Sequence, residues 1–418
     1  MPKFVINGQN RIVGEITVQG AKNSVLPIIA ATILCKGESI IHNCPDLSDV
    51  EVSLKIIRAL GGTYVREGND VVINTDGICC NTIPDELMRE MRSSVVFLGA
   101  ILARCEEAII STPGGCELGP RPIDLHISAL EKLGAVIKEE HGFLRFTTPE
   151  GLKGAEITLS FPSVGATENI ILASCTLKGK TVIHNAAREP EISNLADFLN
   201  CAGARIYGAG SDIITINGVD RLHSAELDVI PDRIAASTYM SAAAVTGGDI
   251  ILTNIMPSHM VSLISFFTDT GCEISSAGKT LRLKAPKRLK RVPTLRTTVY
   301  PGFPTDAGPT SIAMLSKARG TSVFVENIFE NRFRYIDELK RFGAKIKTEG
   351  RVAIVEGVEN LSAANCECTD LRGGAALVVS ALAASGVSRI DKIYHILRGY
   401  ENIVGNLSSL GADIYEEE

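Results

Sequence analysis

A short motif centred on glycine recurs six times along this chain, and this recurrence constrains the fold more than any other feature. The aligned glycines follow one another at intervals of 68 to 73 residues through a chain of 418 residues. They are Gly61, Gly134, Gly203, Gly271, Gly343 and Gly411. A fixed period over a whole chain is the signature of a repeat architecture, so each period is expected to be one structural unit.

Each of these glycines follows a stretch with helical periodicity and precedes a stretch with strand-like alternation. Before Gly134, for example, Ile123, Ile127, Leu130 and Leu133 form one apolar stripe. Glycine suits the end of a helix because it adopts positive φ without a steric penalty. The pattern predicts an amphipathic helix that ends at each repeat glycine and is followed by a strand.

A second helix in each repeat is rich in small apolar residues. Ala235–Ala244 is apolar on nearly every face, which is typical of a helix buried inside a domain. One repeat therefore reads as strand–helix–strand–helix–strand–strand. The length of the chain favours two domains, so we predict an α/β fold with three repeats in each domain.

Charge and cysteine content narrow the class of protein. The formal net charge of −6 argues against a chain whose main partner is nucleic acid or an anionic membrane. The eleven cysteines show no paired spacing, which favours reduced thiols over disulfides. Neither a signal-peptide pattern nor an apolar run long enough to span a bilayer is visible, so we expect a cytoplasmic protein.

Polar residues stand where the buried helices are expected to begin. They are Lys22-Asn23, Arg92-Ser93-Ser94, Ser163 with Thr167, Asp232-Arg233, Thr305-Asp306 and Arg372. Ser163 and Thr305, taken alone, are predicted to be helix caps. A cation at a helix start opposes the helix dipole, unless a bound anion or a buried carboxylate lies beside it. Both explanations remain open for each cation singly, while their recurrence favours an anion site.

Cys116 lies in a stretch of Gly and Pro residues, 113–122, between an expected strand and an expected helix. Such a composition predicts a long exposed loop, and a thiol there is accessible. Arg121 would lower the pKa of this thiol, and a bound anion would raise it again. Cys116 is therefore a candidate nucleophile or proton donor. The alternative is that it is one of eleven ordinary cysteines.

Ten stretches together carry a resemblance to a known family. They are Gly20-Ala-Lys-Asn23, Met91-Arg-Ser-Ser94, Pro113-Gly-Gly-Cys116 through Arg121-Pro-Ile-Asp-Leu-His126, Ser163-Val-Gly-Ala-Thr167, Asn185-Ala-Ala-Arg-Glu-Pro-Glu191, Pro231-Asp-Arg-Ile234, Phe303-Pro-Thr-Asp306, Phe329-Glu-Asn-Arg-Phe333, Thr369-Asp-Leu-Arg372 and Arg398-Gly-Tyr-Glu401. From end to end, the chain resembles the UDP-N-acetylglucosamine 1-carboxyvinyltransferases, a family of enolpyruvyl transferases.

The resemblance implies a fold of two inverse α/β barrels, with three-fold repetition in each. The first domain would span residues 22–230 and carry the Cys116 loop as a lid, and the second would combine residues 1–21 with 231–418. The family transfers the enolpyruvyl group of phosphoenolpyruvate to the 3′-hydroxyl of UDP-N-acetylglucosamine and releases phosphate, the first committed step of peptidoglycan synthesis. It implies small-molecule substrates only, with no cofactor, metal, nucleic acid, membrane or obligate protein partner.

The resemblance also implies roles for particular residues. The catalytic residues would be Cys116 as general acid, Asp306 as acceptor of the hydroxyl proton, Lys22 and Arg398. Phosphoenolpyruvate would be bound by Lys22, Asn23, Arg121 and Arg398. UDP-N-acetylglucosamine would be bound by Arg92, Arg121, Pro122, Ile123, Asp124, Leu125, Ser163, Val164, Gly165, Asp306 and Ile328. A cysteine at position 116 further implies sensitivity to fosfomycin, an epoxide that alkylates this thiol.

Two other functions compete with this interpretation. The first is 5-enolpyruvylshikimate-3-phosphate synthase, which shares the fold and chemistry but has no lid cysteine. The second is a paralogue that binds a nucleotide sugar without turnover. Its support is that Phe161 stands where many members carry Lys, and Ala235 where Glu is usual. The presence of Lys22, Cys116, Asp306 and Arg398 counts against it.

Overall fold

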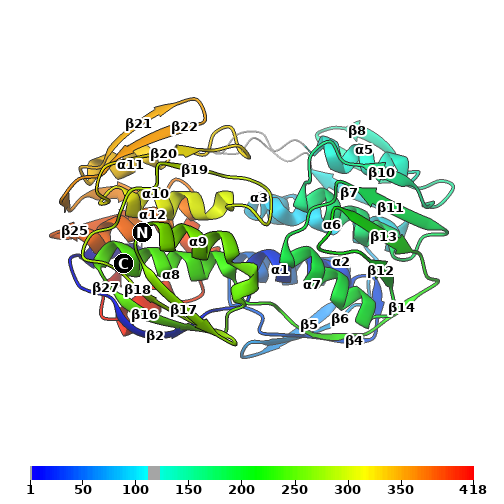
Figure 1. Cartoon of the computed structure of the whole chain (residues 1–418). Helices are drawn as coiled ribbons and strands as arrows, with labels where there is room; N and C mark the ends of the chain where they lie inside the picture. Colours follow the sequence, from blue (N-terminus) through cyan, green and yellow to red (C-terminus); the bar gives the residue numbers. More distant parts are fainter. Residues whose placement is uncertain (1, 112–122) are drawn as a thin grey trace. The chain divides into compact units, whose positions relative to one another are not determined.

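The chain forms two compact units in the computed structural model, which describes residues 2–111 and 123–418, with Arg92 described by its backbone alone. Unit 1 comprises the described residues up to Gln19 together with Pro231–Glu418. Unit 2 comprises the described residues between Gly20 and Ile230. In each unit, strands gather in small sheets around a group of helices (Figure 1).

Unit 2 contains three principal sheets and one short strand pair. The strand orders are β15-β4-β6-β5, β7-β9-β8, β10-β11-β13-β12 and β14-β3. The strands are β3 (Cys35–Lys36), β4 (Glu38–His42), β5 (Thr63–Glu67), β6 (Asp70–Asn74), β7 (Glu107–Ser111), β8 (Val136–Glu140), β9 (Phe143–Thr147), β10 (Glu156–Thr158), β11 (Lys180–His184), β12 (Arg205–Tyr207), β13 (Ile213–Asn217), β14 (Leu222–His223) and β15 (Glu226–Asp228).

Unit 1 repeats this plan. Its strand orders are β17-β18-β16-β2, β19-β20-β22-β21, β24-β26-β1-β27 and β23-β25. The strands are β1 (Lys3–Asn7), β2 (Val13–Thr17), β16 (Asp249–Thr253), β17 (Glu273–Ala277), β18 (Thr280–Lys284), β19 (Thr294–Arg296), β20 (Thr321–Val325), β21 (Lys345–Glu349), β22 (Val352–Glu356), β23 (Leu361–Ser362), β24 (Asn365–Glu367), β25 (Ala384–Ser385), β26 (Val387–Asp391) and β27 (Asp413–Glu417).

The four-stranded sheets share one mixed pairing scheme. In the sheet of β2, for example, β2 pairs in parallel with β16, which pairs antiparallel with β18. The first two strands of the chain both complete sheets of unit 1, because β1 pairs with β26 and β27 near the other end of the chain. This pairing explains why the N-terminal residues belong to the same unit as residues 231–418.

Two kinds of helix alternate along the chain, as the repeat predicts. The amphipathic ones are α2 (Ser48–Leu60), α5 (Asp124–Lys132), α7 (Pro190–Cys201), α9 (Val261–Asp269), α11 (Ile336–Arg341) and α14 (Ile403–Ser409). The buried ones are α1 (Lys22–Thr32), α4 (Phe97–Cys105), α6 (Val164–Ser174), α8 (Arg233–Thr246), α10 (Gly308–Leu315) and α12 (Leu371–Ala383). Shorter elements are α3 (Asp85–Glu90), α13 (Tyr394–Leu397) and the 3₁₀ turns η1 (Arg92–Val96), η2 (Pro257–His259) and η3 (Thr305–Ala307).

The repeat glycines have the backbone conformation that the sequence predicts. Their φ angles lie between +84° and +107°, in the region that side chains disfavour. Gly61 caps α2 directly, and its N–H bonds to the carbonyl groups of Arg58 and Ile57. The predicted α/β fold with three repeats in each unit is confirmed.

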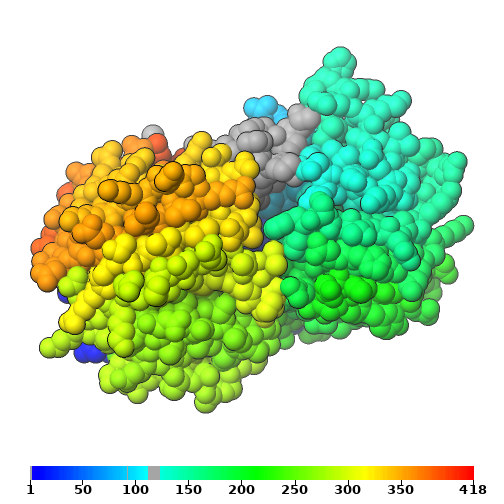
Figure 2. Space-filling model, turned by 45° about the horizontal axis from the view of Figure 1, so that its top comes forward, coloured from blue at the N-terminus to red at the C-terminus, as the bar shows by residue number. Residues whose placement is uncertain are grey.

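The buried helices form the centre of each unit, and the sheets lie outside them. In unit 1, α8, α10 and α12 all contact one another, and nearly every residue of each is buried. On the face of unit 1 seen in Figure 2, yellow-green to orange residues form most of the surface, the colour range that includes β17 to β22. Within residues 2–111 and 123–418, no helix combines the length and apolar composition needed to cross a bilayer.

Small residues allow the buried helices to approach closely. At Gly99 in α4, a β-carbon would lie 2.4 Å from the backbone oxygen of Asn169 in α6. A protein interior packed this tightly cannot accept an extra methyl group without moving the two helices apart.

We expect Gly99→Ala to lower the free energy of unfolding by about 2 kcal/mol, because the new methyl group forces α4 away from α6. Urea denaturation followed by circular dichroism measures the change. Gly68→Ala is the control, since a β-carbon there has no neighbour within 4 Å and meets only the strain of a φ of +64°. A loss for Gly99→Ala no larger than for Gly68→Ala would contradict the packing argument.

Candidate functional site

The start of α1 carries a buried ion pair. Lys22 is 8% exposed, and its Nζ lies 2.6 Å from Oδ2 of Asp49 in the first turn of α2. The partner carboxylate is 2% exposed at its side chain. The sequence left open whether a bound anion or a buried carboxylate lies beside this cation, and the structure shows a buried carboxylate, that of Asp49. Asn23, the neighbouring predicted residue, is exposed.

The same helix α2 contacts the residue before Arg92. The hydroxyl of Ser53 lies 2.9 Å from the carbonyl oxygen of Asp49 and 3.4 Å from the sulfur of Met91, which is fully buried. Arg92 opens the turn η1 directly after Met91. The structure thus brings the backbone of Arg92 near the segment that holds Lys22.

A buried amide joins the segments predicted to bind the nucleotide sugar. Asn169, in α6, accepts from the N–H of Gly99 (2.6 Å) and donates to the carbonyl oxygens of Val95 (2.9 Å) and Gly165 (3.4 Å). Its Nδ2 also lies 2.9 Å from Nδ1 of His126 in α5. The side chain of Asn169 therefore fixes η1, α4, α5 and the start of α6 relative to one another.

This arrangement places two predicted groups of residues side by side. Asp124 and Leu125 begin α5 directly before His126, and the ring of His126 packs against Gly165, where a β-carbon would lie 3.1 Å from Cε1. Ser163 caps α6 by accepting from the N–H of Ala166 at 3.3 Å, as predicted. Burial lowers the pKa of His126 to about 4, against a smaller opposite effect of Asp124.

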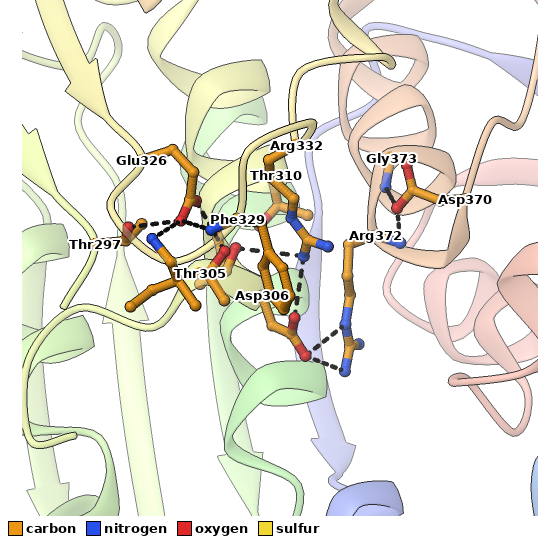
Figure 3. A network of polar contacts seen from close by, with 12 residues as sticks. Thr297, Thr305, Asp306, Thr310, Glu326, Phe329, Arg332, Asp370, Arg372 and Gly373 are labelled. Carbon is orange, nitrogen blue, oxygen red and sulfur yellow. Dashed lines mark hydrogen bonds and ion pairs between the residues drawn. The ribbon is translucent and has the colours of Figure 1, made fainter. Parts of the chain in front are cut away.

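In unit 1, a carboxylate lies between two guanidinium groups (Figure 3). Oδ1 of Asp306 accepts from Arg332 at 3.0 Å, and Oδ2 accepts from Arg372 at 3.3 Å. Both arginine side chains are 5% exposed, whereas that of Asp306 is 28% exposed. Asp306 is therefore fixed in direction and still accessible. The cation at the start of α12 again has a carboxylate partner.

Thr305 is not a helix cap, and this prediction was wrong. Its hydroxyl donates to Oε2 of Glu326 at 2.8 Å, and no side chain caps η3. Oε1 of Glu326 accepts from the hydroxyl of Thr297 (2.9 Å) and from the N–H groups of Ile328 (2.7 Å) and Phe329 (3.1 Å). A buried carboxylate at the end of β20 attracted the hydroxyl more strongly than the helix start did. It also connects Ile328, a predicted sugar-binding residue, with the segment of Asp306.

The segment of Arg398 contacts the start of α12. Gly399 leaves no room for a side chain, because a β-carbon there would lie 2.7 Å from the side chain of Leu371. Next to it, the hydroxyl of Tyr400 accepts from Nη1 of Arg372 at 3.3 Å. Arg398 itself is half-buried at the end of α13. Asp306, Arg372 and the segment of Arg398 therefore form one connected region of unit 1.

Some of the predicted site residues lie outside the described part of the chain. Other residues of the site were not predicted from the sequence. Cys116, Arg121 and Pro122 lie outside the described residues, and Ile123 is half-buried directly before α5. The residues missed as partners are Asp49, Asn169, Glu326 and Arg332. Glu326 carries the clearest signal that could have been used, because it is an acidic residue that directly follows an apolar strand.

The comparisons with known proteins agree with this architecture. The family model described as EPSP synthase (3-phosphoshikimate 1-carboxyvinyltransferase) matches residues 6–407. The enolpyruvyl transferase NikO from Streptomyces tendae has a similar structure, with a TM-score of 0.90 and 23% identity over 99% of this chain and 98% of that chain. The match of the family model over most of the chain places this protein in the class of the enolpyruvyl transferases.

The chain belongs to the UDP-N-acetylglucosamine 1-carboxyvinyltransferase family of these enzymes, which confirms the resemblance found in the sequence. It is 49% identical over 414 residues to UDP-N-acetylglucosamine 1-carboxyvinyltransferase 2 of Caldanaerobacter subterraneus, with 99% of each chain covered. It is 47% identical over 418 residues to UDP-N-acetylglucosamine 1-carboxyvinyltransferase 1 of Symbiobacterium thermophilum, covering 99% of this chain and 94% of that one.

The lowered pKa of His126 predicts a pH dependence of stability. Between pH 6.5 and about 4, the unfolded histidine binds a proton that the buried ring does not, so stability falls as the pH falls through this window. The loss should reach about 3 kcal/mol at its lower end. We expect His126→Gln to remove this part of the loss, measured by urea denaturation from pH 4 to 8.

The control for this experiment is His141→Gln, which changes an exposed histidine in the turn between β8 and β9. Its profile should keep the same slope as that of the unmutated protein. A slope that stays unchanged in His126→Gln as well would show that His126 is not the group responsible.

Proposed function

We propose that the chain transfers the enolpyruvyl group of phosphoenolpyruvate to the 3′-hydroxyl of UDP-N-acetylglucosamine and releases phosphate. The similarity to relatives of that name over almost the whole chain carries the proposal. The geometry of Asp306 supports it, because a partly exposed carboxylate with fixed oxygens suits the removal of a hydroxyl proton.

The reaction is an addition followed by an elimination. The sugar oxygen bonds to the central carbon of phosphoenolpyruvate while Asp306 accepts the hydroxyl proton and the Cys116 thiol protonates the methylene carbon. The resulting tetrahedral intermediate then loses phosphate from the central carbon, while the Cys116 thiolate formed in the addition takes back a proton from the methyl group; this restores the double bond and the thiol. Phosphate leaves with the proton that Asp306 held.

Cations are needed because phosphoenolpyruvate and the intermediate carry a phosphate and a carboxylate. Lys22, Asn23, Arg121 and Arg398 are proposed to bind them, since charge-assisted hydrogen bonds stabilise charge that develops during the addition. The pairing of Lys22 with Asp49 fits this role, because an ion pair already formed keeps the ammonium group oriented before an anion arrives. Arg92 is proposed to orient the reactants.

The nucleotide sugar is proposed to contact the two segments that Asn169 and His126 hold together. These contribute Asp124, Leu125, Ser163, Val164 and Gly165. Arg92, Arg121, Pro122, Ile123, Asp306 and Ile328 complete the proposed set. A cytoplasmic location and independence of a protein partner remain predictions.

The most direct test of the proposed function is release of phosphate from phosphoenolpyruvate in the presence of UDP-N-acetylglucosamine. We expect Asp306→Asn and Cys116→Ser each to lower kcat by about a hundredfold or more, because each removes a proton-transfer group. Fosfomycin should inactivate the unmutated protein and should not modify Cys116→Ser.

Two outcomes would overturn the proposal. Phosphate release that requires shikimate 3-phosphate in place of UDP-N-acetylglucosamine would identify the shikimate enzyme. Binding of the nucleotide sugar without any phosphate release by the unmutated protein would identify the non-catalytic paralogue.

Gly165 offers a separate test of the sugar site. In Gly165→Ala, the new methyl group would lie 3.1 Å from Cε1 and 3.3 Å from Nε2 of His126, so the turn at the start of α6 must shift. We expect KM for UDP-N-acetylglucosamine to rise about fivefold, with KM for phosphoenolpyruvate unchanged, in steady-state kinetics. Gly151→Ala is the control, since a β-carbon there has no neighbour within 4 Å and meets only the strain of a φ of +71°. Equal kinetics for the two variants would remove Gly165 from the site.

A further inference from the structure

We propose that Glu326 is a positioning residue for Asp306, acting through the hydroxyl of Thr305. This inference rests on the proposed function, in which Asp306 accepts the proton of the sugar hydroxyl. Glu326 has no contact with substrate in this proposal. It acts by fixing the two segments that set the direction of the Asp306 carboxylate.

Glu326 is 1% exposed and receives four hydrogen bonds from three segments of unit 1. Within the part of the chain that the structure describes, the hydroxyl of Thr297 and the N–H groups of Ile328 and Phe329 bind Oε1, while the hydroxyl of Thr305 alone binds Oε2. A carboxylate withdrawn from water needs such donors, and removing one of them leaves an unsatisfied charge. The two carboxylate oxygens of Glu326 therefore bind different segments: Oε2 binds that of Thr305, and Oε1 binds those of Thr297 and Ile328.

Oε2 acts on the segment of Asp306 directly, as Figure 3 shows. Thr305 precedes Asp306 in η3, so the hydrogen bond to its hydroxyl restricts the backbone that carries the carboxylate. Arg332 then binds both neighbours, the carbonyl oxygen of Thr305 at 3.4 Å and Oδ1 of Asp306 at 3.0 Å. A shift of Thr305 would disturb both contacts.

Oε1 acts on the other side, through the loop that carries Arg332. The N–H groups of Ile328 and Phe329 fix the start of this loop on Glu326. The guanidinium carbon of Arg332 lies 5.6 Å from the centre of the Phe329 ring, within the range of a cation–π contact. Glu326 therefore holds both Thr305 and the arginine that binds Asp306.

A purely structural role for Glu326 predicts a different outcome from a positioning role. A structural anchor would lose stability when any of its donors is removed, whichever oxygen that donor binds. A positioning residue would lose turnover when the Thr305 hydroxyl is removed and keep turnover when the Thr297 hydroxyl is removed. Thr297 and Thr305 both donate to this carboxylate, and they differ in that the Thr297 hydroxyl also accepts from the N–H of Asn327 at 2.8 Å.

The experiment compares Thr305→Val with Thr297→Val and Thr305→Ser. We expect Thr305→Val to lower kcat about tenfold with both KM values within about twofold, because misdirection of a bound catalytic group lowers turnover without weakening binding. Thr305→Ser, which keeps the hydroxyl, should restore kcat. Thr297→Val should lose at least as much stability as Thr305→Val and keep kcat within about twofold.

Crystal structures of the two valine variants give a readout that does not depend on activity. The distance between Oδ1 of Asp306 and Nη2 of Arg332 should exceed 3.0 Å in Thr305→Val and remain near that value in Thr297→Val. An unchanged distance in Thr305→Val, or an equal loss of kcat in both valine variants, would overturn the inference. Inactivity of the unmutated protein would instead overturn the proposed function, and the crystal distances would still decide the role of Glu326.

Discussion

Six helices in the described part of this protein are buried on nearly all of their faces, and this burial restricts the positions at which charged, catalytically useful side chains can stand. In unit 1, α8, α10 and α12 contact one another and bury nearly all of their residues, so a polar group along their length would have to be satisfied in the core. The end turns of such helices can carry charged side chains at a lower energetic cost than the middle, as Arg372 does in the first turn of α12 and Arg104 in the last turn of α4. This restriction explains why Arg372 and the segment of Asp306 lie at helix starts.

Because charged side chains are confined to the ends of the buried helices, the helix ends and the positions of many charged residues could be predicted from the sequence. The repeat glycines were recognisable because a helix end needs positive φ, and this need is local to a few residues. The helix starts were recognisable because Lys22 and Arg372 interrupt an otherwise apolar pattern. Local physics therefore determined the fold class and most of the positions at which charged groups stand.

The partners of these groups could not be predicted in the same way. Asp306 is 26 positions from Arg332 and 66 from Arg372, and Asn169 joins residues 70 and 43 positions away. Such contacts depend on how the repeats pack together, which one sequence does not encode in any short window. Thr305 illustrates the limit, because its neighbours favour a helix cap and a distant carboxylate, Glu326, binds its hydroxyl instead.

A cation at a helix start can have a buried carboxylate as its partner and still bind an anion, so the two explanations offered for these cations do not exclude each other. Lys22 and Arg372 both have a carboxylate partner, and a buried charge without one would be strongly destabilising. A carboxylate partner also keeps the cation oriented, which reduces the entropy lost when an anion binds. Asp306 differs from Asp49 in remaining 28% exposed beside two guanidinium groups that are 5% exposed. Of these two paired carboxylates, Asp306 is the one that a substrate hydroxyl can more readily reach, and the two guanidinium groups hold it in place.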